Sequence, residues 1–195
     1  QNALPQILPY IPEGGIVVDA GSYIGDHTIA YLNKVGSKGI VMSFEPFKEA
    51  MECQMYNLKA YENVIFCNMA LGSNPGYVQT SCTNNNFGMT TVEESNEGVE
   101  VMRLDDCDLF KELKLDLFKI DCEGCEIDVL EGAKNTIEKY KPVLVIEINE
   151  HTLKVKGKSS KELLQKVISL GYTYRNIYKE QPCEGDQYDI ICFPL

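Results

Sequence analysis

Acidic and amide side chains follow two apolar runs of the chain, in places where strands of a sheet should end. Asp121 closes the run 115–121, and Glu147 and Asn149 lie near the end of the run 143–149. Alternate residues of a strand share a face, so we expect Glu147 and Asn149 to point to the same side. Mg²⁺ prefers oxygen ligands of this kind and needs few of them from a protein. Asp121, Glu147 and Asn149 therefore form a predicted divalent-metal site.

His151 lies just beyond this set and is one of two histidines in the chain. A hydroxyl group is a poor nucleophile until its proton is removed or more weakly held, and a base beside a divalent ion can do both. Histidine changes charge close to neutral pH, which suits that base. The alternative is that Asp121 and Glu123 only cap the following helix, while Glu147 hydrogen-bonds a cofactor or an acceptor.

A strand, a glycine-flanked turn and a helix are predicted in the stretch 16–32. The strand ends at Asp19, and Gly21 lets the backbone take a positive φ and lets a ligand approach the main chain. A dinucleotide-binding turn needs the spacing G-x-G-x-x-G for its pyrophosphate. Here the next glycine is Gly25, and bulky residues such as Tyr23 lie between. The spacing disfavours a pyrophosphate site.

Glu45 follows the apolar run 40–44, where the second strand of a doubly wound sheet should end. A carboxylate at that place can accept hydrogen bonds from both hydroxyls of a ribose. Ribose recognition without a pyrophosphate site points to S-adenosylmethionine (SAM) as the cofactor. A nicotinamide-dependent oxidoreductase and a catalytically silent SAM-binding domain are the alternatives.

Four stretches resemble signatures of the FkbM family of methyltransferases. Its first motif is similar to residues 18–28 and its second to residues 44–46. A third signature, which in the family approaches the adenine, is similar to residues 69–72. A plain strand followed by a glycine turn would also explain residues 69–72. Residues 118–133 closely resemble its most distinctive motif. The resemblance covers about residues 17–149 and implies a SAM-dependent methyltransferase. The expected cofactor-binding residues are Asp19, Gly21, Ser22, Tyr23, Gly25, His27, Thr28, Glu45, Pro46, Asn68, Ala70 and Asp121, and the catalytic candidates are Asp121, Glu123 and His151.

Strand-like and helix-like patterns alternate along the chain, which indicates a parallel sheet with helices on both faces. We expect a Rossmann-like, doubly wound, mostly parallel seven-stranded α/β sheet of the class I methyltransferase type, with an antiparallel edge hairpin over 172–193. Residues 1–195 are expected to form a single methyltransferase domain. The chain begins at Gln1 rather than Met, as a domain cut from a longer protein would.

A polar stretch, 83–98, separates the predicted strands 77–82 and 99–103. Residues 84–90 are rich in Asn and Thr, whose side chains suit a sugar, so we predict a loop on the acceptor side, with a hairpin tip as the alternative. The basic stretch 154–160 is also predicted to be a loop. The family resemblance, this polar stretch and the acidic charge together predict O-methylation of a sugar or a glycosylated small molecule.

The formal net charge of −11, without any run of five Lys or Arg residues, argues against a nucleic-acid partner. No apolar run approaches the roughly 18 residues that span a membrane, and residues 1–15 lack the pattern of a signal peptide. We therefore expect a cytoplasmic protein without a membrane partner. The sequence does not indicate an oligomeric state.

Eight cysteines in a chain of this length are expected to be reduced thiols. Cys122 and Cys125 form a C-x-x-C pair, for which a redox or zinc role is the alternative. Neither a second such pair nor paired histidines complete a zinc site.

Overall fold

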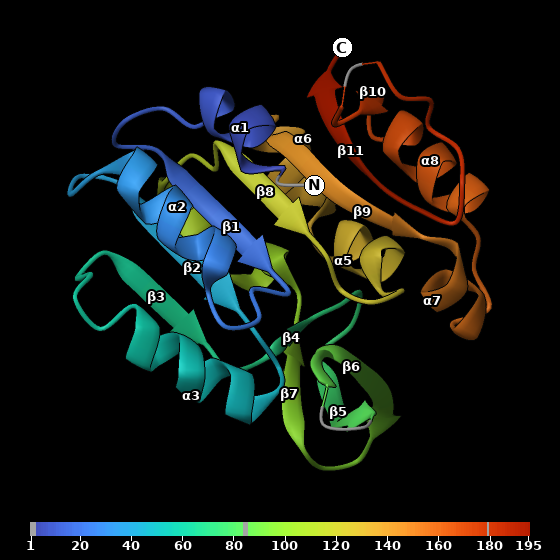
Figure 1. The fold of residues 1–195 in the computed structure, drawn as a ribbon, viewed down its shortest axis with the longest axis horizontal. Helices are drawn as coiled ribbons and strands as arrows, with labels where there is room; N and C mark the ends of the chain where they lie inside the picture. The colour runs from blue at the N-terminus through green and yellow to red at the C-terminus, as the bar shows by residue number, and fades with distance from the viewer. Residues whose placement is uncertain (1–2, 84–85, 179) are drawn as a thin grey trace.

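The computed structural model describes residues 3–83, 86–178 and 180–195. Seven strands form the main sheet, in the order β10-β11-β9-β8-β1-β2-β3 (Figure 1). Strand β11 runs antiparallel to β9 and β10, whereas the other neighbouring strands are parallel. This confirms the predicted doubly wound sheet and its closing hairpin. The strands are β1 (Ile16–Ala20), β2 (Ile40–Phe44), β3 (Val64–Cys67), β8 (Leu117–Ile120), β9 (Val143–Asn149), β10 (Tyr172–Asn176) and β11 (Gln187–Pro194).

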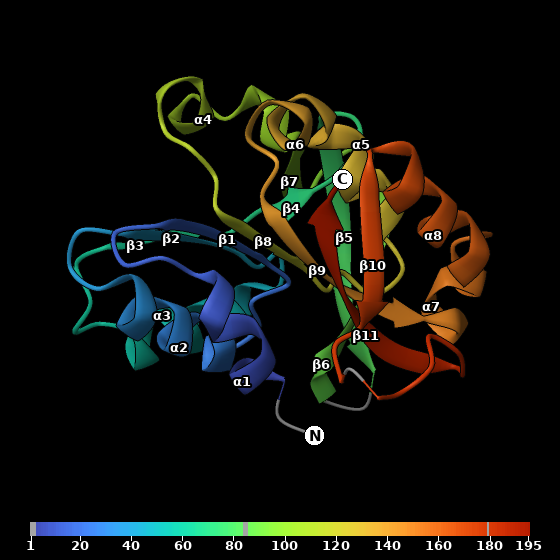
Figure 2. The same cartoon turned by 90° about the horizontal axis from the view of Figure 1, so that it is seen from above.

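Helices cover both faces of this sheet (Figure 2). Central strands are buried on both sides, so they are apolar at successive positions rather than at alternate ones. In β1, Val17 packs in the cluster that contains Tyr31, and Val18 packs in the opposite cluster with Leu130. No helix in the described ranges is long and apolar enough to cross a membrane. One face carries α1 (Leu4–Ile7), η1 (Leu8–Tyr10), α2 (Asp26–Val35) and α3 (Lys48–Asn57); the other carries η2 (Leu104–Asp106), α4 (Leu109–Glu112), α5 (Glu126–Gly132), α6 (Lys134–Tyr140) and α8 (Ser160–Ser169).

A second sheet lies beyond the carboxyl ends of β1 and β8 (Figure 1). Its four strands have the order β4-β7-β5-β6. A side chain on Gly132 would place its Cβ 1.9 Å from the backbone oxygen of Gly72, so this glycine lets α5 pack directly against the segment after β4. The strands are β4 (Ala70–Leu71), β5 (Gly76–Thr83), β6 (Asn86–Ser95) and β7 (Val99–Met102).

The prediction of a loop over 83–98 is wrong for most of that stretch. Residues 86–95 form β6, which pairs with β5 in an antiparallel hairpin, and Asn84 and Asn85 lie outside the described residues. The β-branched run Thr90-Thr91-Val92 favours a strand, and the preceding asparagines obscured that signal.

Two other boundaries differ from the expectation. The helix predicted after residue 122 is two helices, α5 and α6, which are separated at Ala133. Helix α7 (Glu150–Val155) takes up the first residues of the predicted loop 154–160. The Asn149 side chain caps α7 by accepting hydrogen bonds from the backbone N–H groups of His151 and Thr152, which explains why a helix begins there.

Candidate active site

A cavity of about 1070 Å³ opens at the carboxyl ends of β1, β2, β8 and β9, between the main sheet and the second sheet. This is the edge at which doubly wound sheets bind ligands. Most of the predicted site residues line it: Asp19, Gly21, Ser22, Tyr23, His27, Glu45, Pro46, Ala70, Asp121, Glu123, Glu147 and Asn149. The other four, Gly25, Thr28, Asn68 and His151, are not among the described residues that line it.

The turn after β1 is pressed against the end of β8. Gly21 has a φ of +74°, and a Cβ at this position would lie 1.7 Å from the backbone oxygen of Asp121. The backbone N–H groups of Gly21 and Ser22 donate to the oxygen of Phe44, at 3.0 and 3.1 Å. Only glycine fits here, and it brings the ends of three strands together at the cavity.

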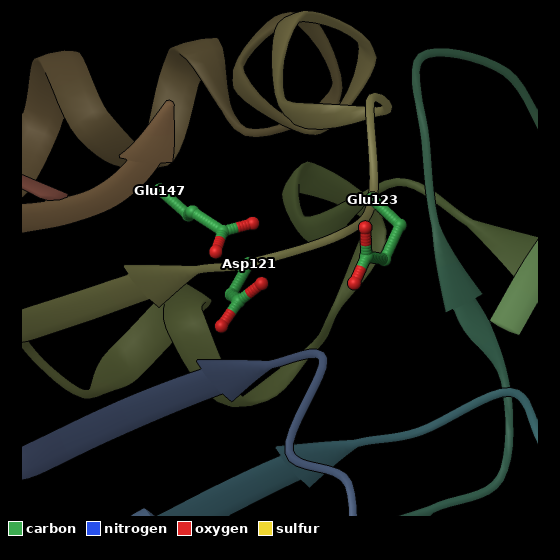
Figure 3. Close-up of side chains that lie close together, drawn as sticks. All are labelled: Asp121, Glu123 and Glu147. Atoms are coloured by element: carbon green, nitrogen blue, oxygen red, sulfur yellow. The ribbon is translucent and has the colours of Figure 1, made fainter. Parts of the chain in front are cut away.

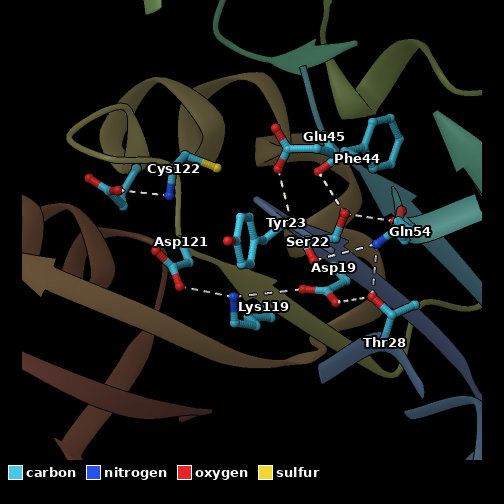
Figure 4. A network of polar contacts seen from close by, with 12 residues as sticks. Asp19, Ser22, Tyr23, Thr28, Phe44, Glu45, Gln54, Lys119, Asp121 and Cys122 are labelled. Carbon is cyan, nitrogen blue, oxygen red and sulfur yellow. Dashed lines mark hydrogen bonds and ion pairs between the residues drawn. The ribbon is translucent and has the colours of Figure 1, made fainter. Parts of the chain in front are cut away.

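Glu45 is fixed by backbone amides. Its Oε2 accepts from the N–H of Tyr23 at 2.9 Å (Figure 4). Its Oε1 accepts from the N–H of Phe47 at 2.8 Å. Burial raises the pKa of Glu45, and these two hydrogen bonds partly offset that rise. Each carboxylate oxygen has a second lone pair, so Glu45 can still accept from two ligand hydroxyls. The side chain of Asn68 donates to the backbone oxygens of Glu45 and Pro46, which holds this turn in place.

Lys119 links two aspartates in the floor of the cavity (Figure 4). Its Nζ lies 3.1 Å from Oδ2 of Asp121 and 3.7 Å from Oδ1 of Asp19. Burial alone would lower the pKa of Lys119, but the two carboxylates outweigh burial and hold that pKa well above its ordinary value. Thr28 donates to Oδ2 of Asp19 at 2.7 Å and so supports Asp19 rather than facing the cavity. Sequence reasoning missed Lys119, although a lysine between Phe118 and Ile120 in a buried strand was the available signal.

Gln54 of α3 joins the turn after β1 to this network, and sequence reasoning missed it as well. Its Nε2 donates to the backbone oxygen of Ser22 and to Oγ1 of Thr28, and its Oε1 accepts from Ser43 at 2.6 Å. Gly25, the residue that precedes α2, lies against Gln54. A single glutamine in a polar helix gives no signal of such a role in the sequence.

Three carboxylates that line the cavity lie close together (Figure 3). Asp121, Glu123 and Glu147 each have an oxygen within 4.8 Å of the others. Burial, followed by the charge of Asp121, raises the pKa of Glu123 to about 7 and that of Glu147 to about 8. Gln187 donates to Oε1 of Glu147 at 2.8 Å, while Oε2 is buried without a hydrogen-bond partner in the described part of the chain. This cluster can therefore hold a proton near neutral pH, or a cation.

Two residues of the predicted metal and base set have other roles. Asn149 uses its side-chain oxygen to cap α7, accepting from the N–H groups of His151 and Thr152 at 3.2 and 3.4 Å. The cluster contains Glu123 where the sequence suggested Asn149. His151 lies in the first turn of α7 with an exposed side chain, away from the three carboxylates.

The turn after β8 is capped by Glu126. Its Oε1 accepts from the N–H groups of Cys122 and Gly124, both at 3.0 Å. The capping role considered for Asp121 and Glu123 is not found in the described part of the chain: Cys125 precedes the first residue of α5, and no side chain caps this helix. Both cysteines of the C-x-x-C pair are free thiols, and burial raises the pKa of Cys122 and Cys125, which makes them poor nucleophiles and metal ligands.

Comparisons with known proteins agree with this geometry. The model of the methyltransferase FkbM domain matches residues 19–174. No curated protein matches the sequence. The structure is similar to methyltransferase FkbM from Methylobacillus flagellatus, with a TM-score of 0.62 and 17% identity over 93% of this chain. This chain spans only 44% of the length of that protein.

Two further solved structures have the same fold. An rRNA methylase from Streptococcus thermophilus gives a TM-score of 0.59 at 14% identity, with 99% of this chain and 94% of that chain covered. A SAM-dependent O-methyltransferase from Thermotoga maritima gives 0.57 at 13% identity, with 99% and 64% covered. At these identities the likenesses establish the class I methyltransferase fold.

Proposed function

The chain belongs to the FkbM methyltransferase family, and from that premise we propose that it transfers a methyl group from SAM to a hydroxyl group of a sugar or a glycosylated small molecule. We further propose that residues 1–195 act as one methyltransferase domain. The carboxylate cluster is the observation that supports a hydroxyl as the methyl acceptor, because it offers a base beside the predicted cofactor site. Oε2 of Glu147 is the free acceptor within that cluster.

The residues of the cavity fit SAM. Glu45 is held by two amides with lone pairs to spare, which suits the two ribose hydroxyls. The Gly21 turn exposes its main chain to the cavity, beside the Asp121 carboxylate, and suits the methionine part. When bound, SAM supplies a methyl group on a positively charged sulfur, and the carboxylates of the floor favour that charge.

The carboxylate cluster accounts for the activation of the acceptor. Glu147 would accept the proton of the acceptor hydroxyl on Oε2. Bound SAM would supply the methyl group, whose bond to sulfur breaks as its bond to the acceptor oxygen forms, and would leave as S-adenosylhomocysteine. Burial and Asp121 raise the pKa of Glu147 to about 8, close to the working pH at which a general base is most effective. Gln187 fixes the other oxygen of this carboxylate and so orients Oε2.

A divalent ion is the second way to use the same cluster. Asp121, Glu123 and Glu147 form an all-oxygen set suited to Mg²⁺, with Glu123 in place of the Asn149 expected from the sequence. We favour the base, because Gln187 already donates to Oε1 of Glu147 and leaves Oε2 as an acceptor without a partner in the described part of the chain.

Incubation with trideuteromethyl-SAM and a panel of neutral and acidic glycosides tests the proposed function. We expect mass spectrometry to show one CD₃ group on an oxygen of at least one glycoside. Asp121→Ala is expected to abolish this product, whereas His151→Ala, on the exposed surface of α7, is expected to retain it. Labelling confined to a protein amide or to nucleic acid would overturn the proposal.

A further inference from the structure

One exposed aromatic side chain lies in the wall of the cavity. Tyr77 of β5 is 49% exposed and lines the cavity from the side of the second sheet. The other large apolar side chains that are exposed in the described part of the chain lie outside the cavity lining. An aromatic ring that is open to a cavity offers a large, rigid apolar surface to a ligand.

The remaining aromatic rings of the lining come from the main-sheet side. Tyr23 lies in the turn after β1, His27 in the first turn of α2 and Phe44 at the end of β2, where the cofactor is expected. Among the described residues, Tyr77 is therefore the aromatic ring that the second sheet contributes to the cavity.

Strand pairing separates Tyr77 from the expected position of the adenine. Ala70 and Gly76 both pair with Val101, so the three residues share one face of the second sheet. Tyr77 is the next residue after Gly76 and points to the other face. The ring is thus on the opposite side of this sheet from Ala70, the residue expected beside the adenine, and is open to a different ligand.

Small polar side chains line the same part of the cavity. Ser95 of β6 is paired with Tyr77 in the strand register, and Ser73 and Asn74 lie in the turn that follows β4. Hydroxyl and amide groups can both donate and accept hydrogen bonds. An apolar ring with such groups beside it matches a sugar, which has C–H groups on the faces of its ring and hydroxyl groups around the rim.

We propose that Tyr77 stacks against a C–H face of the acceptor's sugar ring and is a specificity-determining residue of the site. This inference rests on the proposed function, because it takes the acceptor to be a sugar. The carboxylate cluster belongs to the main-sheet side of the same cavity, so a sugar that lies on Tyr77 turns hydroxyl groups of its rim toward Glu147. The acceptor class is a pyranoside with C–H groups on one face, such as a glucoside or a galactoside.

Equilibrium binding to the protein saturated with S-adenosylhomocysteine tests this wall without any turnover. The probes are methyl β-D-glucopyranoside, methyl β-D-galactopyranoside, sorbitol, which has hydroxyl groups but no ring, and phenol, which has a ring but no C–H face of this kind. In calorimetry, we expect at least one pyranoside to bind about tenfold or more tightly than sorbitol and phenol. Saturation-transfer NMR should show the strongest transfer at the C–H protons of one face of that pyranoside.

Variants of Tyr77 separate stacking from a structural role. Tyr77→Ala is expected to weaken pyranoside binding by about tenfold, and Tyr77→Phe, which keeps the ring, to retain it. Both variants should bind S-adenosylhomocysteine with wild-type affinity. Tyr56→Ala is the matched control, because Tyr56 on α3 is 70% exposed but lies outside the cavity lining, and it should leave every affinity unchanged.

Five results would each overturn the proposal. They are no binding of either pyranoside, equal or tighter binding of sorbitol or phenol, wild-type pyranoside affinity in Tyr77→Ala, loss of pyranoside binding in Tyr77→Phe, and loss of S-adenosylhomocysteine binding in Tyr77→Ala. Failure of the proposed function would appear separately, as a pyranoside that binds on Tyr77 but receives no methyl group.

Discussion

Lys119→Met should destabilise the protein far more than the loss of an ordinary surface lysine. The Asp19 side chain is 0% exposed and the Lys119 side chain 9% exposed, so the substitution leaves a buried carboxylate without its cation. Methionine fills a similar volume, which limits the effect to the lost charge. Asp19 then keeps only the hydrogen bond from Thr28, and Asp121 loses the group that fixes its position.

Removal of one partner from a buried ion pair costs about 3–5 kcal/mol. For a chain of this length each kcal/mol lowers the melting temperature by about 2–4 °C, so we expect a drop of roughly 6–20 °C. Lys114→Met is the matched control. Lys114 also pairs with an aspartate, Asp116, but its side chain is 66% exposed, so its loss should cost about 1 kcal/mol or less.

Urea unfolding at pH 7, followed by circular dichroism, measures both variants against the wild-type protein. We expect Lys119→Met to unfold at a lower urea midpoint than the wild-type protein, with an unchanged dependence of the unfolding free energy on urea concentration. Lys114→Met should unfold at a midpoint close to that of the wild-type protein. A loss below about 1 kcal/mol in Lys119→Met would refute the claim that this lysine holds the two aspartates. Similar losses in the two variants would refute it as well.

Three other predictions concern the same cavity. Because Glu147 has a pKa raised to about 8, its contribution to stability is full below about pH 4.5 and is lost as the pH rises through 8. The unfolding free energy of Glu147→Gln, relative to wild type, should therefore rise by up to about 4 kcal/mol from about pH 5 to about pH 9, and a flat difference in urea titrations would contradict this. Gly21→Ala should lower the melting temperature and abolish binding of S-adenosylhomocysteine in calorimetry, because its Cβ would collide with the Asp121 backbone; wild-type affinity would contradict it. Excess EDTA should leave methyl transfer intact, and loss of activity that Mg²⁺ restores would assign the cluster to a metal ion instead.

Most of the main sheet was predictable from local patterns in the sequence. Apolar runs marked the central strands of the main sheet, since strands buried on both faces must be apolar throughout. The edge strand β10 is more polar and only partly buried. The position of Gly21 was predictable because a backbone of positive φ that touches the end of β8 restricts the choice of residue. The position of Glu45 was predictable because it directly follows the apolar strand β2. The second sheet was only partly predictable, because β6 begins in an asparagine-rich stretch that usually indicates a turn.

The supporting residues of the site were not predictable in the same way. Gln54 and Gln187 act through partners on other elements, and their own positions look like ordinary polar positions. Lys119 contacts Asp121 two residues along the chain, but its second partner, Asp19, lies on another strand. Asn149 lies at the end of β9 and lines the cavity together with Glu147, as strand alternation predicts. The sequence did not indicate that its side-chain oxygen caps the helix that begins at Glu150, nor that His151, in the first turn of that helix, is exposed.

Calorimetric titration with S-adenosylhomocysteine and with NAD is the most direct test of the claim that this cavity is a SAM site with Glu45 at the ribose. We expect the wild-type protein to bind S-adenosylhomocysteine and not NAD. Glu45→Ala should weaken that binding by at least about tenfold, because two charge-assisted hydrogen bonds are lost. Glu93→Ala, an exposed position on β6, should leave it unchanged. Binding of NAD without binding of S-adenosylhomocysteine would contradict the account.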